Sequence, residues 1–268
     1  MAKPYEDWLH EIEEPFEAED FEKALDLIDQ AIEEYPDDSE LFALRGDAEW
    51  ALDDVISAQE SYQEAVRIEP NSSEFLGALS RIHFALCDFF GATRYAKEAL
   101  KFDGSAEALD VLSRLAERSG RIAESDKLAL RAHQIDDETF NLPFRMEENE
   151  FREAANEALE ALPERFLTAI RDGNVAILVE PFPQEEILIE EAPPFDPTIL
   201  GLYRGVPLPE RDAGDPGLPD VIHIFQHNIE RVAMNREDLV REITITVYHE
   251  LGHFFGLDED QLADLDLA

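Results

Sequence analysis

Two histidines and a glutamate near the end of the chain have the types and spacing needed for metal-assisted hydrolysis. His249 and His253 are four residues apart. Residues four apart lie on one face of a helix, so both imidazole rings can reach a single ion. Glu250 lies beside them, where its carboxylate can take a proton from a water that the ion activates. The stretch therefore predicts a metal site with a general base on a helix.

The helix that must carry these residues competes with a strand pattern just upstream. Residues 243–247 alternate apolar and polar side chains as a strand does. Over a longer stretch the apolar residues make a helical stripe, which consists of Val240, Ile243, Val247, Leu251 and Phe254. Asn235 is a good helix N-cap, with acidic residues in the first turn after it. We therefore expect a helix from Glu237 to Phe255.

Other elements of the second half can be placed more coarsely. A helical pattern runs from Phe151 to about Arg171, and Pro163 is expected to kink or divide it. β-Branched or apolar runs predict strands, which cover residues 175–179, 200–205 and 221–225. Residues 181–219 hold 9 of the 15 prolines and are therefore expected to be rich in loops. The segment 139–150, which breaks the pattern upstream, is the predicted domain boundary.

The first half of the chain repeats itself every 34 residues. Small residues return at matching places, which are Ala24, Ala58 and Ala92, and then Ala31, Ala65, Ala99 and Ala132. Each unit closes on a residue that ends a helix or forms a turn, namely Pro36, Pro70, Gly104 and Asp137. The pattern resembles tetratricopeptide repeats, in which paired antiparallel helices stack into a solenoid.

The repeat resemblance covers roughly residues 5–138, as three clear units and a degenerate fourth. Gly46 and Ala58 match the family's small packing positions, whereas serines replace them later, at Ser80, Ser113 and Ser125. The resemblance implies a concave surface that binds a protein or peptide. The alternative is a scaffold that only packs against the second half of the chain.

The second half resembles the minimal zincin type of predicted bacterial metallopeptidases. Three motifs carry the resemblance in order, which are Leu-Gly-Leu-Tyr-Arg-Gly at 200–205, Leu-Pro-Asp-Val-Ile at 218–222, and His-Glu-x-x-His-x-x-Gly-x-x-Glu at 249–259. It covers about residues 151–268 and implies a small sheet above an active-site helix. It also implies zinc held by His249, His253 and an acidic third ligand, with Glu250 as general base. Gly256 would let the chain turn and return that third ligand.

The third ligand is where this chain departs from the family pattern. Glu259 stands at the expected position, where the family has aspartate or serine, and Asp258 or Asp260 could replace it as ligand. A peptidase also needs a group that steadies the developing oxyanion. No Tyr, His or Arg follows His253, so the candidates lie upstream and are Tyr203, Arg204, His223, His227 and Tyr248.

Composition narrows the classes of partner. The chain has 63 acidic and 22 basic residues and a net charge of −41. Residues 161–268 hold 22 acidic and 7 basic residues, so both halves are acidic and no single tail is responsible. Such a charge repels nucleic acid and anionic lipid. The single Cys87 and the absence of a signal-peptide pattern or a long apolar run predict a cytoplasmic protein.

These observations predict a multidomain chain with an all-α repeat solenoid at residues 1–140 and a small α+β zincin-like domain at residues 151–268. The first functional hypothesis is a zinc-dependent metallopeptidase whose repeat array binds protein substrates or partners. The alternative is a non-catalytic interaction protein with a degenerate or structural zincin-like domain. The intact Glu250 favours catalysis, because a structural metal site has no use for a general base.

Overall fold

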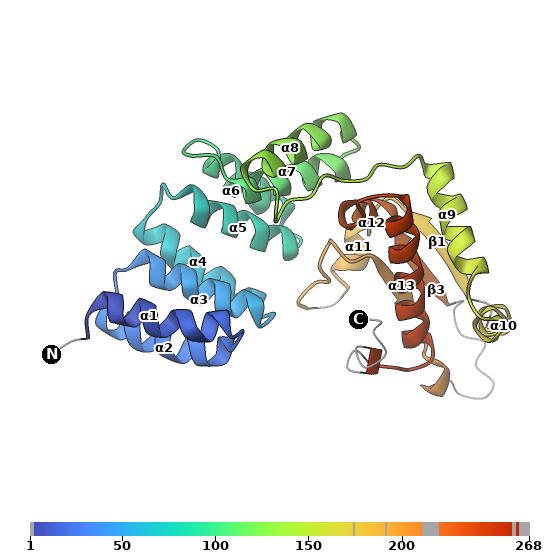
Figure 1. Ribbon diagram of the computed structural model, residues 1–268, viewed down its shortest axis with the longest axis horizontal. Coiled ribbons are helices and arrows are strands. Elements are labelled where there is room, and N and C mark those ends of the chain that lie inside the picture. Colours follow the sequence, from blue (N-terminus) through green and yellow to red (C-terminus); the bar gives the residue numbers. More distant parts are fainter. Residues whose placement is uncertain (1–2, 174, 191, 211–219, 259–260, 263–268) are drawn as a thin grey trace. The chain divides into compact units, whose positions relative to one another are not determined.

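The structure is a computed structural model that describes residues 3–173, 175–190, 192–210, 220–258 and 261–262. The chain divides into two units, which are residues 1–140 with 191–195, and residues 141–190 with 196–268. Helical hairpins make up the first unit, and the second combines helices with a small sheet (Figure 1). The predicted fold class, a helical repeat array followed by a small α+β domain, is confirmed.

The same type of turn recurs in the helical hairpins of the first unit. Its helices are α1 (Tyr5–Glu17), α2 (Phe21–Glu34), α3 (Ser39–Ala51), α4 (Val55–Ile68), α5 (Ser73–Ala85), α6 (Phe89–Ala99), α7 (Ala106–Arg118) and α8 (Ile122–Ile135). Aspartates 34 residues apart cap the second helix of three hairpins, with each carboxylate accepting from a backbone N–H, and these are Asp20, Asp54 and Asp88. The residue before each cap has a positive φ of 56 to 62°. The repeat in the sequence is therefore a repeat of turn and cap.

Small residues let the paired helices of each hairpin approach closely. Ala24, Ala58 and Ala92 are all fully buried. A side chain at Gly46 would meet the ring of Tyr62 at 2.5 Å. In the degenerate fourth hairpin two buried serines, Ser113 and Ser125, lie with their hydroxyl oxygens 3.0 Å apart. Serine therefore keeps the close approach there, and each hydroxyl finds a hydrogen-bond partner.

The second unit places its helices against one small sheet. Its elements are α9 (Glu148–Glu160), α10 (Glu164–Asp172), β1 (Ala176–Glu180), α11 (Glu185–Leu188), β2 (Gly201–Arg204), a 3-10 turn (Leu208–Glu210), β3 (Val221–Phe225), α12 (Gln226–Val232) and α13 (Arg236–Phe254). Among the described residues the strand order is β1-β3-β2. β1 runs parallel to the central β3, and β2 runs antiparallel to it. The three predicted strands are thus present, and β2 is an edge strand.

The helix predicted from the apolar stripe forms as α13. Ile243, Val247 and Leu251 are buried on one side, together with Ile222 and Ile224 of β3. Burial of this whole stripe outweighs the local strand preference of residues 243–247. The other predicted helix is divided at Pro163 into α9 and α10, because proline cannot donate the backbone hydrogen bond of a continuous helix.

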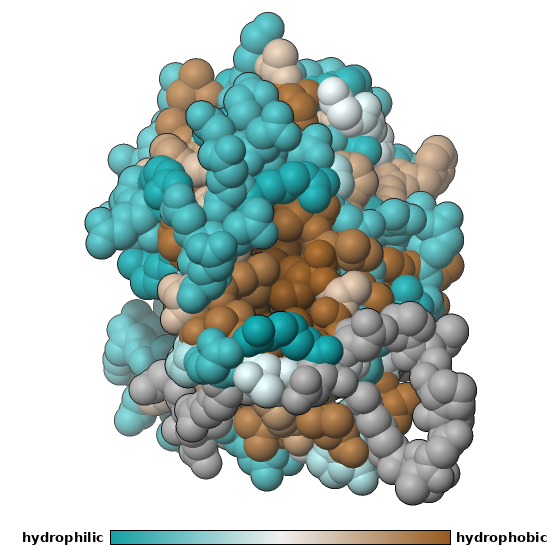
Figure 2. Space-filling model, turned by 90° about the vertical axis from the view of Figure 1, so that its right-hand side faces the viewer, coloured by the Kyte–Doolittle hydropathy of each residue, from teal (hydrophilic) through white to brown (hydrophobic). Residues whose placement is uncertain are grey.

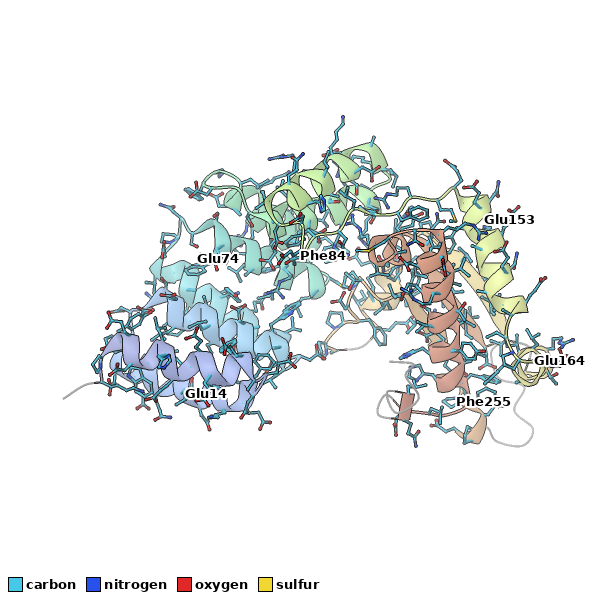
Figure 3. All side chains as sticks on the ribbon, in the orientation of Figure 1. Glu14, Glu74, Phe84, Glu153, Glu164 and Phe255 are labelled. Carbon is cyan, nitrogen blue, oxygen red and sulfur yellow. The ribbon has the colours of Figure 1, made fainter. Side chains whose placement is uncertain are left out.

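The surfaces of both units are acidic. Glu14, Glu74, Glu153 and Glu164 are exposed, two on each unit (Figure 3). On the side of the second unit where α9 and α10 lie, hydrophobic side chains show between hydrophilic regions (Figure 2). Within the described part of the chain, no helix has the length and hydrophobicity needed to cross a membrane.

Candidate metal centre

The two histidines of α13 converge as the sequence predicts. Nε2 of His249 and Nε2 of His253 are 3.0 Å apart, and the ring planes meet at 80°. Two nitrogen ligands of one tetrahedral zinc ion, each about 2.0–2.1 Å from it, lie about 3.4 Å apart. Both side chains are half-buried, so they lie between the core and solvent. The pair therefore fits two ligands of one ion.

A helix-ending turn orients His253. Gly256 has a φ of +81°, its N–H donates to the carbonyl of His253, and the N–H of Leu257 donates to the carbonyl of Gly252. These two bonds form a Schellman motif, which requires a residue that tolerates a positive φ. The turn expected at Gly256 is therefore confirmed.

The same turn orients the ring of His253 through its Nδ1 atom. It brings the carbonyl oxygen of Leu257 to 3.2 Å from Nδ1 of His253. A carbonyl can only accept, so Nδ1–H is the donor, and in the neutral ring Nε2 keeps its lone pair. Backbone carbonyls hold metal-binding histidines in this way in many proteins. Nε2, the nitrogen that faces His249, is thus the one prepared to bind.

Of the three acidic residues predicted as candidates for the third ligand, only Asp258 lies within the described residues. Glu259, which is the predicted third ligand, and Asp260 lie outside the described residues. Asp258 is described, and its carboxylate accepts from the backbone N–H of Gln261 at 2.9 Å. Within the described residues, no group of three His, Cys, Asp or Glu side chains gathers around a common point. Leu262 packs on Gly252, so the chain after the turn comes back to α13.

Glu250 lies against the edge strand of the sheet. Its side chain is buried, and Oε2 accepts a hydrogen bond of 2.6 Å from the backbone N–H of Tyr203 on β2. Gly201 makes this approach possible, because a side chain there would meet Thr246 at 2.5 Å and Oε1 of Glu250 at 3.0 Å. The sequence does not predict the contacts that Tyr203 and Gly201 make with Glu250, although both residues belong to the motif at 200–205.

The five side chains expected as oxyanion donors each have another partner. The Tyr203 hydroxyl donates to Asp220, and the Arg204 guanidinium donates to Glu190. Nδ1 of His223 lies 2.5 Å from Glu180, Nδ1 of His227 lies 2.9 Å from Glu230, and the Tyr248 ring packs edge-on against Phe166. His223 and His227 therefore each form a hydrogen bond with a carboxylate of the second unit.

Substituting Gly201 tests the close approach of β2 and α13. We expect Gly201→Val to destabilise the second unit by about 1–3 kcal/mol, because the new side chain must push the strand off the helix. The measurement is the midpoint of urea unfolding of the second unit, monitored by hydrogen exchange of the β3 amides. Leu202→Val on the same strand is the matched control, and an equal shift in both variants would contradict this explanation.

A family model matches part of the second unit. The model of the zincin-like metallopeptidase family matches residues 173–268, which include the sheet, α13 and the histidine pair. No curated protein matches the sequence.

Several solved structures resemble the chain weakly. The crystal structure of MamA shares 14% identity at a TM-score of 0.43, and the match covers 59% of this chain and 84% of that one. The crystal structure of YrrB, a TPR protein with an unusual peptide-binding site, shares 15% identity at a TM-score of 0.42, covering 61% and 84%. The repeats of the first unit are identified by their own turns and packing. Residues 173–268 thus match the zincin-like metallopeptidase family, which is the family that the three sequence motifs of the second half resemble.

Proposed function

We propose that the second unit is a zinc-dependent peptidase, with His249 and His253 as zinc ligands, Glu250 as general base and Glu259 as third ligand. The convergence of the two Nε2 atoms, with Nδ1 of His253 held by the Leu257 carbonyl, is the observation that carries the proposal. A purely structural site usually has four protein ligands and no adjacent carboxylate base. Glu250 therefore supports a catalytic site over the non-catalytic alternative.

In the proposed hydrolysis, the zinc ion and the side chains of the protein have different roles. Zinc, when bound, supplies a positive charge that polarises the scissile carbonyl and makes a water more acidic. The Glu250 carboxylate accepts a proton from the attacking water and passes it to the nitrogen of the departing amine. The edge amide of Tyr203 orients that carboxylate, and the Leu257 carbonyl orients His253.

Removal and return of the metal tests this function. We expect the purified full chain to hydrolyse an unfolded protein such as reduced, labelled casein, to lose this activity on dialysis against a chelator, and to regain it with zinc. The His249→Ala variant, treated in the same way, is the control for a contaminating protease. Activity that survives the chelator, or that zinc restores equally in His249→Ala, would contradict the proposal.

We also propose that the repeat array recruits polypeptide substrates. A groove of about 580 Å³ lies between α1 and α3. Leu9, Phe16 and Leu44 provide apolar surface in it, and Glu6, Glu13 and Glu40 add acidic groups. Mixed apolar and charged grooves of this kind suit extended or helical peptide segments.

Two substrates of different length distinguish recruitment from catalysis. We expect Leu44→Ser to raise KM for a protein substrate and to leave KM unchanged for a short peptide that occupies only the second unit. Leu52→Ser, at an exposed residue just after α3, is the control. Tryptophan fluorescence of Trp8 and Trp50 checks that the array stays folded. Equal KM values in the variant and the wild type for both substrates would argue against recruitment by this groove.

A further inference from the structure

We propose that Asp220 is a positioning residue for Glu250 and acts through Tyr203. This inference rests on the proposed role of Glu250 as general base. Asp220 belongs to the motif at 218–222 and Tyr203 to the motif at 200–205, and neither motif contains a predicted zinc ligand. In this proposal, the motifs at 200–205 and 218–222 position the general base of the motif at 249–259.

Tyr203 makes two short hydrogen bonds in opposite roles. Its backbone N–H donates to Glu250 at 2.6 Å, and its hydroxyl donates to Oδ1 of Asp220 at 2.6 Å. The Asp220 side chain is buried, and its residue is the last before β3 begins. A hydrogen bond to a buried carboxylate is stronger and more directional than one between neutral, exposed groups. Tyr203 is therefore held at both its backbone and its ring.

The amide of Tyr203 is available to Glu250 because of the register of the sheet. Leu200 accepts from the N–H of Phe225, so Leu200 and Phe225 are a hydrogen-bonded pair. Such pairs alternate along an antiparallel ladder. Leu202 opposite His223 is the next one, and Tyr203 opposite Ile222 is not. The Tyr203 N–H therefore points away from β3, toward α13 and Glu250.

The hydroxyl of Tyr203 needs an anchor because β2 is short and has a partner on one side only in the described sheet. Asp220 supplies the anchor from the position just before β3, and its own carbonyl accepts from the N–H of Ala176, which ties it to β1 as well. Gly205 leaves room for this contact, because a side chain there would collide with Asp220 and with the Tyr203 hydroxyl. The Asp220 carboxylate thus fixes the end of β2 that presents the amide.

Loss of this anchor should loosen the base without removing it. Misplacement of a catalytic group by a fraction of an ångström to one ångström lowers turnover strongly and leaves substrate affinity nearly unchanged. We expect Tyr203→Phe to lower kcat about tenfold, with KM and zinc content unchanged. Asp220→Asn retains a carbonyl oxygen that can accept from the hydroxyl, so its kcat should lie between those of Tyr203→Phe and the wild type.

Hydrogen exchange gives a readout that needs neither zinc nor substrate. In the metal-free full chain, the amide of residue 203 should exchange about tenfold faster in Tyr203→Phe than in wild type, the effect of about one net hydrogen bond. Glu250→Ala should raise exchange at the same amide and thereby shows that Glu250 protects it. Amides of α12 should keep their wild-type rates in all variants.

Tyr62→Phe is the matched control. It removes a tyrosine hydroxyl that also donates to an aspartate, Asp47, at 2.6 Å, but in the first unit. We expect wild-type turnover and wild-type exchange at residue 203. Wild-type kcat and exchange in Tyr203→Phe, or faster exchange across the whole second unit, would overturn the inference. A wild-type chain without hydrolysis would instead refute the proposed function, and the exchange data would still decide whether Asp220 fixes β2.

Discussion

Glu250→Gln is expected to lower the turnover number by about three orders of magnitude while the protein still binds zinc. The glutamine side chain has nearly the same shape, so the close packing of α13 on Gly201 is kept. Its carbonyl oxygen can still accept from the N–H of Tyr203. What is lost is the carboxylate that takes the proton of the attacking water. The effect should therefore fall on kcat, with a smaller change in KM.

The measurement is kcat on labelled casein beside the zinc content of the same preparation. Glu242→Gln is a suitable control, because it removes one carboxylate from α13 two turns away, where the side chain is half-buried and contacts Arg241. Its activity should be close to wild type. Turnover within a factor of a few of wild type in Glu250→Gln would exclude Glu250 as the base.

Glu230→Ala is expected to destabilise the second unit by about 3 kcal/mol. Glu230 is fully buried and accepts hydrogen bonds from four groups, which are Nη1 of Arg145, the backbone N–H of Met146, Nε2 of Gln226 and Nδ1 of His227. Its own carbonyl accepts from the N–H of Phe144. The carboxylate therefore ties the segment before α9 to α12, and its removal leaves Arg145 without this partner.

The stabilisation by Glu230 depends on pH. Burial raises the pKa of Glu230, whereas hydrogen bonds from His227, Gln226 and Arg145 lower it. The hydrogen bonds together outweigh burial, so the pKa of Glu230 in the folded protein lies below the usual value. A lowered pKa gives stability that is complete above the pKa of the unfolded chain, about 4.3, and that is lost as the pH falls through the folded value. The difference between wild type and Glu230→Ala should thus be largest near neutral pH and shrink below pH ~4.

The stability of the second unit in wild type and Glu230→Ala can be measured by hydrogen exchange of the β3 and α12 amides at increasing urea concentrations. Trp8 and Trp50 both lie in the first unit, so tryptophan fluorescence follows the array and serves as an internal reference. Glu157→Ala is the control variant, because it removes an exposed ion pair with Arg236 that is worth at most about 1 kcal/mol. Equal losses in the two variants would show that the buried network contributes no more than a surface pair.

Features that depend on local spacing could be predicted from the sequence. The alanines at intervals of 34 identify the hairpins, because each must be small for the same packing reason. The histidine pair follows from helical geometry alone once the stripe from Val240 to Phe254 is preferred over the strand pattern. Pro163 lies between α9 and α10, because proline cannot donate the backbone hydrogen bond of a continuous helix. In each case the spacing of residues along the chain carries the prediction.

Features that depend on distant residues could not be predicted in this way. Glu250 and the Tyr203 amide are 47 positions apart, and Arg145 and Glu230 are 85 apart. The hydrogen bonds of Tyr203 to Asp220 and of His223 to Glu180 likewise join residues that are far apart in the sequence. The third ligand predicted at Glu259 remains a prediction.

Metal analysis of the purified full chain tests the central claim most directly. We expect about one zinc per chain in the wild type and in His10→Ala, whose side chain is exposed on α1, and almost none in His249→Ala or His253→Ala. The two site variants should keep the helical content of the array, so that loss of metal is not loss of fold. Absence of zinc from the wild type, or an unchanged zinc content in His249→Ala, would contradict a metal centre on α13.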